Sequence, residues 1–184
     1  MKKPIIFSVL FLIISSISSF GGGIWLEENL DPETNLRTGK FADLNTGSVY
    51  EIKPDANLQG AILTTADLKR VNLQGANLEG ANLSNANLQG ANLAHAYLQG
   101  ANFEGANLQG AYLQEANLSE ATLAQANLSE ANLLQANLFK ADLTGVNLNN
   151  VKRDTLDLFN LNKINIIQSQ MEEGGIGGGI SPEQ

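Results

Sequence analysis

The chain repeats every five residues from Ala56 to Asn150, nineteen times without a break. A typical unit is Ala76-Asn77-Leu78-Glu79-Gly80. The central residue is Leu in 18 of the 19 units, with Phe103 the exception, and the residue two before it is Ala in 17. The position between them is Asn or Asp in 15 units. Repetition of this density has to be explained before any other feature of the sequence.

A five-residue period fits neither regular secondary structure. On an α-helix each step of five turns the chain by about 140° net, so the leucines would wind round the whole circumference. On a flat strand an odd period sends successive leucines to opposite faces. A coil that turns a corner every five residues points each Leu and each preceding Ala towards its axis, and stacked coils align Leu over Leu as in a solenoid. Gly at the fifth position of eight units suits such corners. The period alone leaves the number of sides per coil open.

These Ala-(Asn/Asp)-Leu-x-x units closely resemble the pentapeptide-repeat family over 95 of the 184 residues. The resemblance implies an all-β solenoid, a right-handed quadrilateral parallel β-helix with four units per coil. It also implies that the central residue and the residue two before it face inward. Exported members of photosynthetic bacteria are similar in layout, with a leader before a short repeat domain, and this implies the thylakoid lumen or the periplasm.

Residues 1–26 have the order of a secretory signal peptide. Two lysines precede an apolar run at residues 5–14, and small Ser and Gly residues follow. We predict that this leader is cleaved, after Ser18 or after Gly21. The alternative is an uncleaved membrane anchor over residues 5–26, although its strongly apolar part is only about ten residues long. Cleavage removes two lysines and no acidic residue, so the formal net charge changes from −8 to −10.

The segments that flank the repeats are predicted to close the ends of the solenoid, because an uncovered end exposes apolar core. Residues 27–55 are assigned as an N-terminal cap or linker, in which Asp31 and Pro32 suit a helix start. Residues 151–173 carry apolar side chains at helical spacing and are predicted to form a C-terminal helical cap, with membrane association as the alternative. Residues 174–184 are rich in glycine and are predicted to be a disordered tail.

The composition excludes several kinds of active site. Without Cys and with a single His, the chain has no disulfide, no thiolate zinc site, no Cys nucleophile and no His-cluster metal site. His95 occupies a fifth position, where we expect it at an exposed corner with Glu115 as its only orienting group. No nucleophile occupies a matched position. We therefore predict a non-enzymatic protein with no catalytic residues, no cofactor and no metal.

The charge balance argues against a nucleic acid partner, since 19 acidic residues face 11 Lys and Arg. Some members of the family are similar in outline to DNA and inhibit type II topoisomerases such as gyrase by mimicry. The repeats from Val71 to Phe139 contain five acids and no Lys or Arg, so this function is the alternative. On a four-sided coil, however, these acids are expected to be scattered rather than aligned in dense rows.

Four apolar side chains fall at outward positions on a surface otherwise made of Asn, Gln and Ser. They are Tyr97, Tyr112, Leu134 and Phe139. Grouped exposed apolar residues mark contact surfaces, so we predict that these four form an interaction patch on two adjoining faces. The alternative is that Leu134 and Phe139 pack beneath the C-terminal cap.

The favoured function is an exported, rigid structural or interaction module with an unidentified protein partner. We expect no membrane contact after the leader is cleaved, and a monomer or a weak homodimer.

Overall fold

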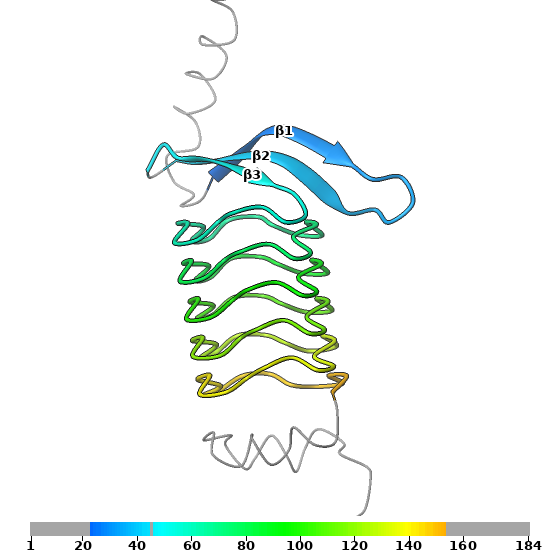
Figure 1. The fold of residues 1–184 in the computed structure, drawn as a ribbon, viewed down its shortest axis with the longest axis vertical. Coiled ribbons are helices and arrows are strands. Elements are labelled where there is room, and N and C mark those ends of the chain that lie inside the picture. The colour runs from blue at the N-terminus through cyan, green and yellow to red at the C-terminus, as the bar shows by residue number, and fades with distance from the viewer. Residues whose placement is uncertain (1–22, 45, 154–184) are drawn as a thin grey trace, which may run out of the picture.

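The computed structural model describes residues 23–44 and 46–153 and consists of a stack of coils closed at one end by a small β-sheet (Figure 1). Residues 1–22, which hold most of the predicted leader, lie outside the described residues. So do residues 154–184, which hold most of the predicted C-terminal cap and the predicted tail. Within the described ranges, no helix is long and apolar enough to cross a membrane.

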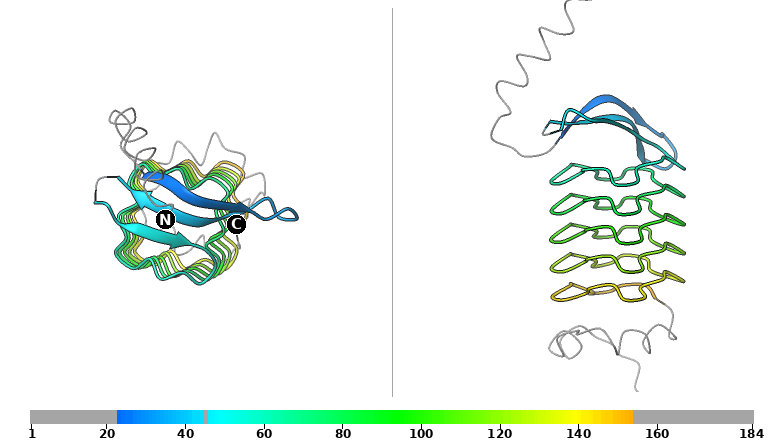
Figure 2. Two further views of the ribbon diagram at one scale, coloured as in Figure 1. Left: turned by 90° about the horizontal axis from the view of Figure 1, so that it is seen from above. Right: turned by 60° about the vertical axis from the view of Figure 1, so that its left-hand side comes forward.

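Each coil takes twenty residues and therefore has four sides. Parallel bridges join the residue before each centre to its counterpart twenty residues later, from Asn57 with Asn77 to Asn132 with Lys152. Figure 2 shows the resulting square outline, viewed along the axis. We number the sides from Ala56. The first side then holds residues 56–60, 76–80, 96–100, 116–120 and 136–140, and the fourth holds 71–75, 91–95, 111–115 and 131–135.

A single unit is a short extended segment followed by a tight turn. The N–H of Ala61 donates to Leu58 O at 3.0 Å and closes the turn, while the N–H of Leu58 donates to Asn77 O on the next coil at 2.7 Å. The fifth residue of the unit must have a positive φ, as at Gly60 with 65° and at His95 with 59°. The left-handed conformation costs a non-glycine residue about 1–2 kcal/mol. At corners that lack glycine, the hydrogen bonds between coils outweigh this cost.

The core is the row of inward side chains along the axis. Leu98 and Phe103 have no exposed surface, and the Ala residues two before each centre are buried as well. The predicted division into two inward and three outward positions is thus confirmed. Burial weakens in the last coil, where Leu138 and Leu148 are only partly buried.

The N-terminal cap is a three-stranded antiparallel sheet that lies across the first coil (Figure 1). It consists of β1 (Gly23–Leu30), β2 (Arg37–Asp43) and β3 (Val49–Ile52), in the order β1-β2-β3. Phe41 and Ile52 are 1% and 0% exposed and cover the core of the first coil. The open end that a solenoid would otherwise present is therefore closed by apolar side chains from this sheet.

Arg37 and Trp25 connect the cap sheet to the first coil through hydrogen bonds, and a cation–π contact joins their two side chains. The backbone of Arg37 continues the ladder of the fourth side, because its N–H donates to Arg70 O at 2.6 Å and its carbonyl accepts from Asn72 N–H at 2.8 Å. The Arg37 guanidinium lies 4.5 Å from the centre of the Trp25 ring. Trp25 Nε1 in turn donates to the carbonyl of Asp67 at 3.1 Å. The cap and the first coil thus form one hydrogen-bonded unit.

The predicted helix start at Asp31 and Pro32 is wrong. Both residues lie in the turn between β1 and β2, where Asp31 Oδ1 accepts from Thr34 N–H at 2.8 Å and from Glu33 N–H at 2.9 Å. These bonds hold the pKa of the Asp31 carboxyl below its usual value. Asp followed by Pro starts turns as well as helices, and here the backbone bond from Asp31 N–H to Leu36 O closes a hairpin.

Two boundaries of the predicted segments also differ from the structure. Residues 23–26, assigned to the leader, form the start of β1. Residues 151–153, assigned to the C-terminal cap, continue the coil, because Lys152 N–H donates to Ala131 O and Leu133 N–H donates to Lys152 O. The ladder uses only backbone atoms, so it extends past the last Leu-centred unit.

Candidate interaction surface

The outward position before each centre normally carries an asparagine that stabilises the coil. In the unit of Asn117, the side-chain oxygen accepts from the N–H of Ser119 at 3.2 Å. The same oxygen accepts from the side-chain amide of Asn137 on the next coil at 3.0 Å. Each such bond contributes about 0.5–1.5 kcal/mol. An asparagine at this position therefore has a structural role within the fold.

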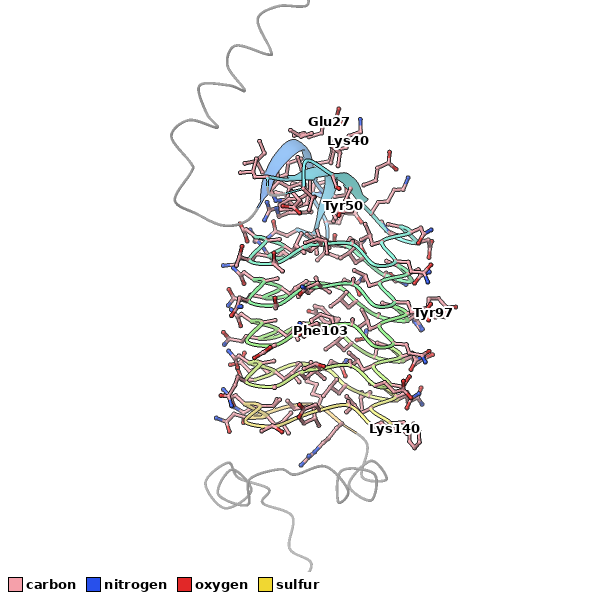
Figure 3. All side chains as sticks on the ribbon, turned by 90° about the vertical axis from the view of Figure 1, so that its left-hand side faces the viewer. Glu27, Lys40, Tyr50, Tyr97, Phe103 and Lys140 are labelled. Carbon is pink, nitrogen blue, oxygen red and sulfur yellow. The ribbon has the colours of Figure 1, made fainter. Side chains whose placement is uncertain are left out.

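Tyr97 and Tyr112 interrupt two of these asparagine columns. Tyr97 stands between Asn77 and Asn117 on the first side, and Tyr112 stands between Asn92 and Asn132 on the fourth side. A phenol ring offers no acceptor close to the backbone, so neither tyrosine can replace the bonds that an asparagine makes there. Their rings are 60% and 50% exposed. Figure 3 shows Tyr97 projecting from the coil surface, in contrast to Phe103 in the interior.

The two tyrosines flank the corner between the fourth and first sides. On that corner, His95 Nδ1 lies 3.3 Å from Glu115 Oε2, and both side chains are about half exposed. Leu134 is on the same corner one coil further on, because its carbonyl accepts from Glu115 N–H at 2.9 Å; its side chain is 37% exposed. We call His95, Tyr97, Tyr112, Glu115 and Leu134 the corner patch.

Phe139 is 59% exposed but does not belong to the corner patch. It lies at the opposite corner of the first side, where the Lys140 ammonium is 5.3 Å from the centre of its ring. Lys140 also contacts Glu120 at 3.4 Å. The four predicted patch residues thus divide into three around one corner and one at the next. Whether residues beyond 153 cover Leu134 and Phe139 lies outside the described part of the chain.

His95 has the exposed corner position and the Glu115 neighbour that the sequence predicted. Its side chain contacts that carboxylate, and both groups are about half exposed to solvent. No group of three or more His, Cys, Asp or Glu in residues 23–44 and 46–153 is placed to hold a metal ion. This corner offers a partly aromatic contact surface with an imidazole and a carboxylate between the two tyrosines.

The five acids between Val71 and Phe139 form no continuous row. Glu115 faces His95, Glu120 faces Lys140, and Glu79 accepts from Gln59 Nε2 at 3.2 Å. Duplex DNA carries a charge about every 1.7 Å, so roughly ten charges over the ~16 Å that residues 71–139 span at ~4.8 Å per coil. The five carboxylates are spread over four sides, and two of them lie beside cationic or protonatable groups. The negative charge along any one side is therefore much lower than along a DNA strand.

The surface that the sequence analysis missed is the outer face of the cap sheet. There Glu27 of β1 lies opposite Lys40 of β2, which lies opposite Glu51 of β3. The three residues are far apart in the sequence, so only the strand register reveals that they form one row. Residues 37–43 show no regular alternation of polar and apolar side chains, so the local pattern gives little indication of a strand there.

Comparison with known proteins agrees with the repeat. The family model described as pentapeptide repeats matches residues 55–90, 86–123 and 116–152 in eight copies. Members of this family adopt a right-handed quadrilateral β-helix, the fold class that the resemblance implied. A search of curated protein sequences finds no match.

Three solved structures are among those similar to the chain. Rfr23, a pentapeptide repeat protein from the cyanobacterium Cyanothece 51142, is 29% identical over 71% of this chain and 76% of its own, with a TM-score of 0.41. The pentapeptide repeat protein alr5209 from Nostoc is 39% identical over 48% of this chain and 78% of its own, with a TM-score of 0.43. A pentapeptide repeat protein from the thylakoid lumen of Arabidopsis thaliana is 25% identical over 68% of this chain and 85% of its own, with a TM-score of 0.31.

Proposed function

The chain belongs to the pentapeptide repeat family, and we propose that it is an exported, non-enzymatic member that acts as a rigid protein-interaction module. Its compartment in this proposal is the thylakoid lumen or the periplasm. The corner patch is the surface that contacts the protein partner. The coils hold that surface in a fixed geometry, which lowers the entropy cost of binding.

The observation that carries the proposal is the pair of tyrosines in the asparagine columns. Tyr97 and Tyr112 each replace a residue that would bond its own turn and the neighbouring coil, and each leaves half or more of its surface exposed. The fold gains little from such a replacement. Exposed tyrosines are, however, among the residues that contribute most to protein interfaces. Two of them on either side of one corner indicate selection for contact rather than for stability.

Export is supported by the composition of the leader. A positive start, an apolar run and small residues follow each other in residues 1–26. Strand β1 begins at Gly23, so cleavage after Ser18 or Gly21 would leave the cap sheet complete. N-terminal sequencing of the secreted or lumenal protein tests this part of the proposal, with Ser19 or Gly22 as the expected first residue.

We expect a photo-crosslinking residue at the corner patch to capture one partner in the native compartment. p-Benzoylphenylalanine replaces Tyr97 or Tyr112, because its size and aromatic character match tyrosine. The same residue at Ile62 or Thr122 is the control, since both occupy the same outward position on the second side. A discrete adduct from the first two sites and not from the control sites is the expected result.

The double variant Tyr97→Ser/Tyr112→Ser should then reduce recovery of that partner at least tenfold, with Ile62→Ser/Thr122→Ser close to the unsubstituted protein. Equal recovery with both double variants would remove the corner patch as the binding surface.

A supercoiling assay separates this function from DNA mimicry. We expect no inhibition of gyrase at low micromolar protein, because the carboxylates are too few and too scattered to resemble a duplex. Inhibition at those concentrations, or retention of the tagged full-length chain in the cytoplasm, would overturn the proposal in favour of the mimic.

A further inference from the structure

The cap sheet has an outer face that points away from the coils. Side chains alternate along β2, so Phe41 faces the core and its neighbours Lys40 and Ala42 face outward. Figure 3 shows Glu27 and Lys40 above the sheet, directed away from the solenoid. No part of residues 23–44 or 46–153 lies over that face, which forms a small surface at one end of the stack of coils.

Two rungs of this outer face differ sharply in character. The apolar rung crosses all three strands, because Ala42 pairs with Ile24 on one side and with Val49 on the other. Val49 is 53% exposed, although it is apolar. The next rung is charged, with Lys40 paired between Glu27 and Glu51. Apolar and charged groups thus lie in adjacent parallel rows.

The charged rung alternates in sign. Glu27 Oε1 lies 3.1 Å from Lys40 Nζ, and both side chains are about half exposed. On the other side, Glu51 contacts Lys53, whose ammonium donates to it and, together with Lys40, holds the pKa of the Glu51 carboxyl below its usual value. The rung itself reads minus, plus, minus; together with Lys53, which lies just beyond the end of β3, the two ion pairs are neutral as a whole. Two copies can approach here without the repulsion expected from a net charge of −8.

We propose that this outer face binds the same face of a second copy, head to head, about a two-fold axis parallel to β2 and midway between β2 and β3. Such an axis keeps each residue at the same height along the strand direction and reverses the order of the strands. Strand β2 of one copy therefore faces β3 of the second copy. The apolar rung then meets the apolar rung of the second copy. Lys40 meets Glu51 of the second copy, and Glu51 meets its Lys40, as an isologous contact requires.

The other way of joining two sheets is disfavoured by charge. Strand β1 is an edge strand, and two copies of it could pair side by side. Antiparallel pairing of β1 about the Glu27–Glu28 peptide would place these two carboxylates of one copy opposite the same two residues of the other. Like charges at opposed positions destabilise a strand pair. The face, rather than the edge, is therefore the surface that fits a second copy.

The size of the face predicts a weak dimer. With the axis between β2 and β3, only these two strands of each copy face each other, over about 10 Å across the strands and ~13–23 Å along them, or roughly 130–230 Å² per copy. The total of roughly 260–460 Å² is well below the ~1,200 Å² at which stable interfaces begin. We expect a dissociation constant between about 10 µM and 1 mM. Because paired charges lie at its centre, the dimer should weaken as salt is raised.

Charge-swap complementation tests the proposal. The whole 184-residue sequence is expressed, and the folded product is examined by sedimentation velocity over a concentration series at low and high salt. Lys40→Glu places Glu against Glu51 of the second copy, and Glu51→Lys places Lys against its Lys40. Each variant alone should be monomeric at concentrations where the unsubstituted protein dimerises. An equimolar mixture should dimerise again, since the Glu introduced at position 40 of one copy faces the Lys introduced at position 51 of the other, and the unchanged Glu51 of the first copy faces the unchanged Lys40 of the second.

The controls carry the same charge changes away from the face. Lys69→Glu lies on the first coil, and Glu33→Lys lies in the turn between β1 and β2; neither should affect dimerisation. Far-UV circular dichroism confirms that each variant is folded. A monomer at several hundred micromolar in low salt, a dimer that persists in either single variant, or a mixture that stays monomeric would each overturn the proposed contact.

Discussion

Replacing Leu98 by Asp is expected to abolish the folded state, whereas Gln99→Asp should leave it almost unchanged. Leu98 has no exposed surface and lies in the stack of first-side leucines, between Leu78 and Leu118. The substitution removes about 2–3 kcal/mol of apolar burial and places a carboxylate among Leu and Ala side chains, at a cost of several kcal/mol more. The sum approaches or exceeds the ~5–15 kcal/mol by which a domain of this size is stable.

The position of Leu98 in the middle of the rod increases this effect. In a solenoid each coil is stabilised mainly by its two neighbours, so a disrupted central coil leaves two short stacks with new open ends. Gln99 is the next residue, on the same side and the same coil, but it is exposed. A surface change of this kind is worth about 0.5 kcal/mol or less. Thermal melts followed by circular dichroism compare the two variants, and equal losses would contradict the inward and outward assignment.

The repeated part of the chain was predictable because each unit carries the same local determinants. A small residue, an amide, a leucine and a corner recur at fixed spacing, and every coil then meets neighbours of its own kind. The number of sides per coil was not predictable in this way, because a five-residue period is compatible with more than one corner angle. The resemblance to the family supplied that number, and the bridges at a spacing of twenty residues confirm it.

The cap was not predictable in the same way because nothing in it repeats. Asp31 and Pro32 suit a helix start and a turn equally, and tertiary contacts decide between them. Phe41 and Ile52 must reach the first coil, and an antiparallel sheet places both on one face. Strand pairing across residues 23–52 depends on contacts distant in sequence, which local patterns do not specify.

The candidate surfaces also differ in how far the sequence alone could predict them. The exposure of Tyr97 and Tyr112 follows from their position in the unit, so the sequence predicted it. The separation of Phe139 from the other three depends on which corner each residue occupies, and this requires the four-sided coil. The outer face of the cap depends on the register of three strands and was invisible beforehand.

Gly39→Ala is expected to detach the cap, at a cost of about 2–4 kcal/mol, whereas Gly100→Ala should cost about 1 kcal/mol. Gly39 has a φ of 144°, which side chains other than glycine rarely adopt, and an added Cβ would overlap the carbonyl oxygen of Glu27. That oxygen belongs to the backbone of β1, so the clash is relieved only if β1 moves away from β2. Movement of β1 would in turn weaken the contacts that Trp25 makes with Arg37 and Asp67.

Gly100 provides the matched control because its strain is of a kind that the coil already tolerates. Its φ is 64°, nothing lies within 4 Å of an added Cβ, and His95 and Glu120 adopt the same conformation at equivalent corners. The single tryptophan of the chain is Trp25, so its fluorescence reports on the cap while circular dichroism reports mainly on the coils. In Gly39→Ala the emission should shift to the red and its transition should precede that of the coils. An unshifted emission, or the same loss of stability in both variants, would show that the cap does not depend on the close approach of β1 and β2 at Gly39.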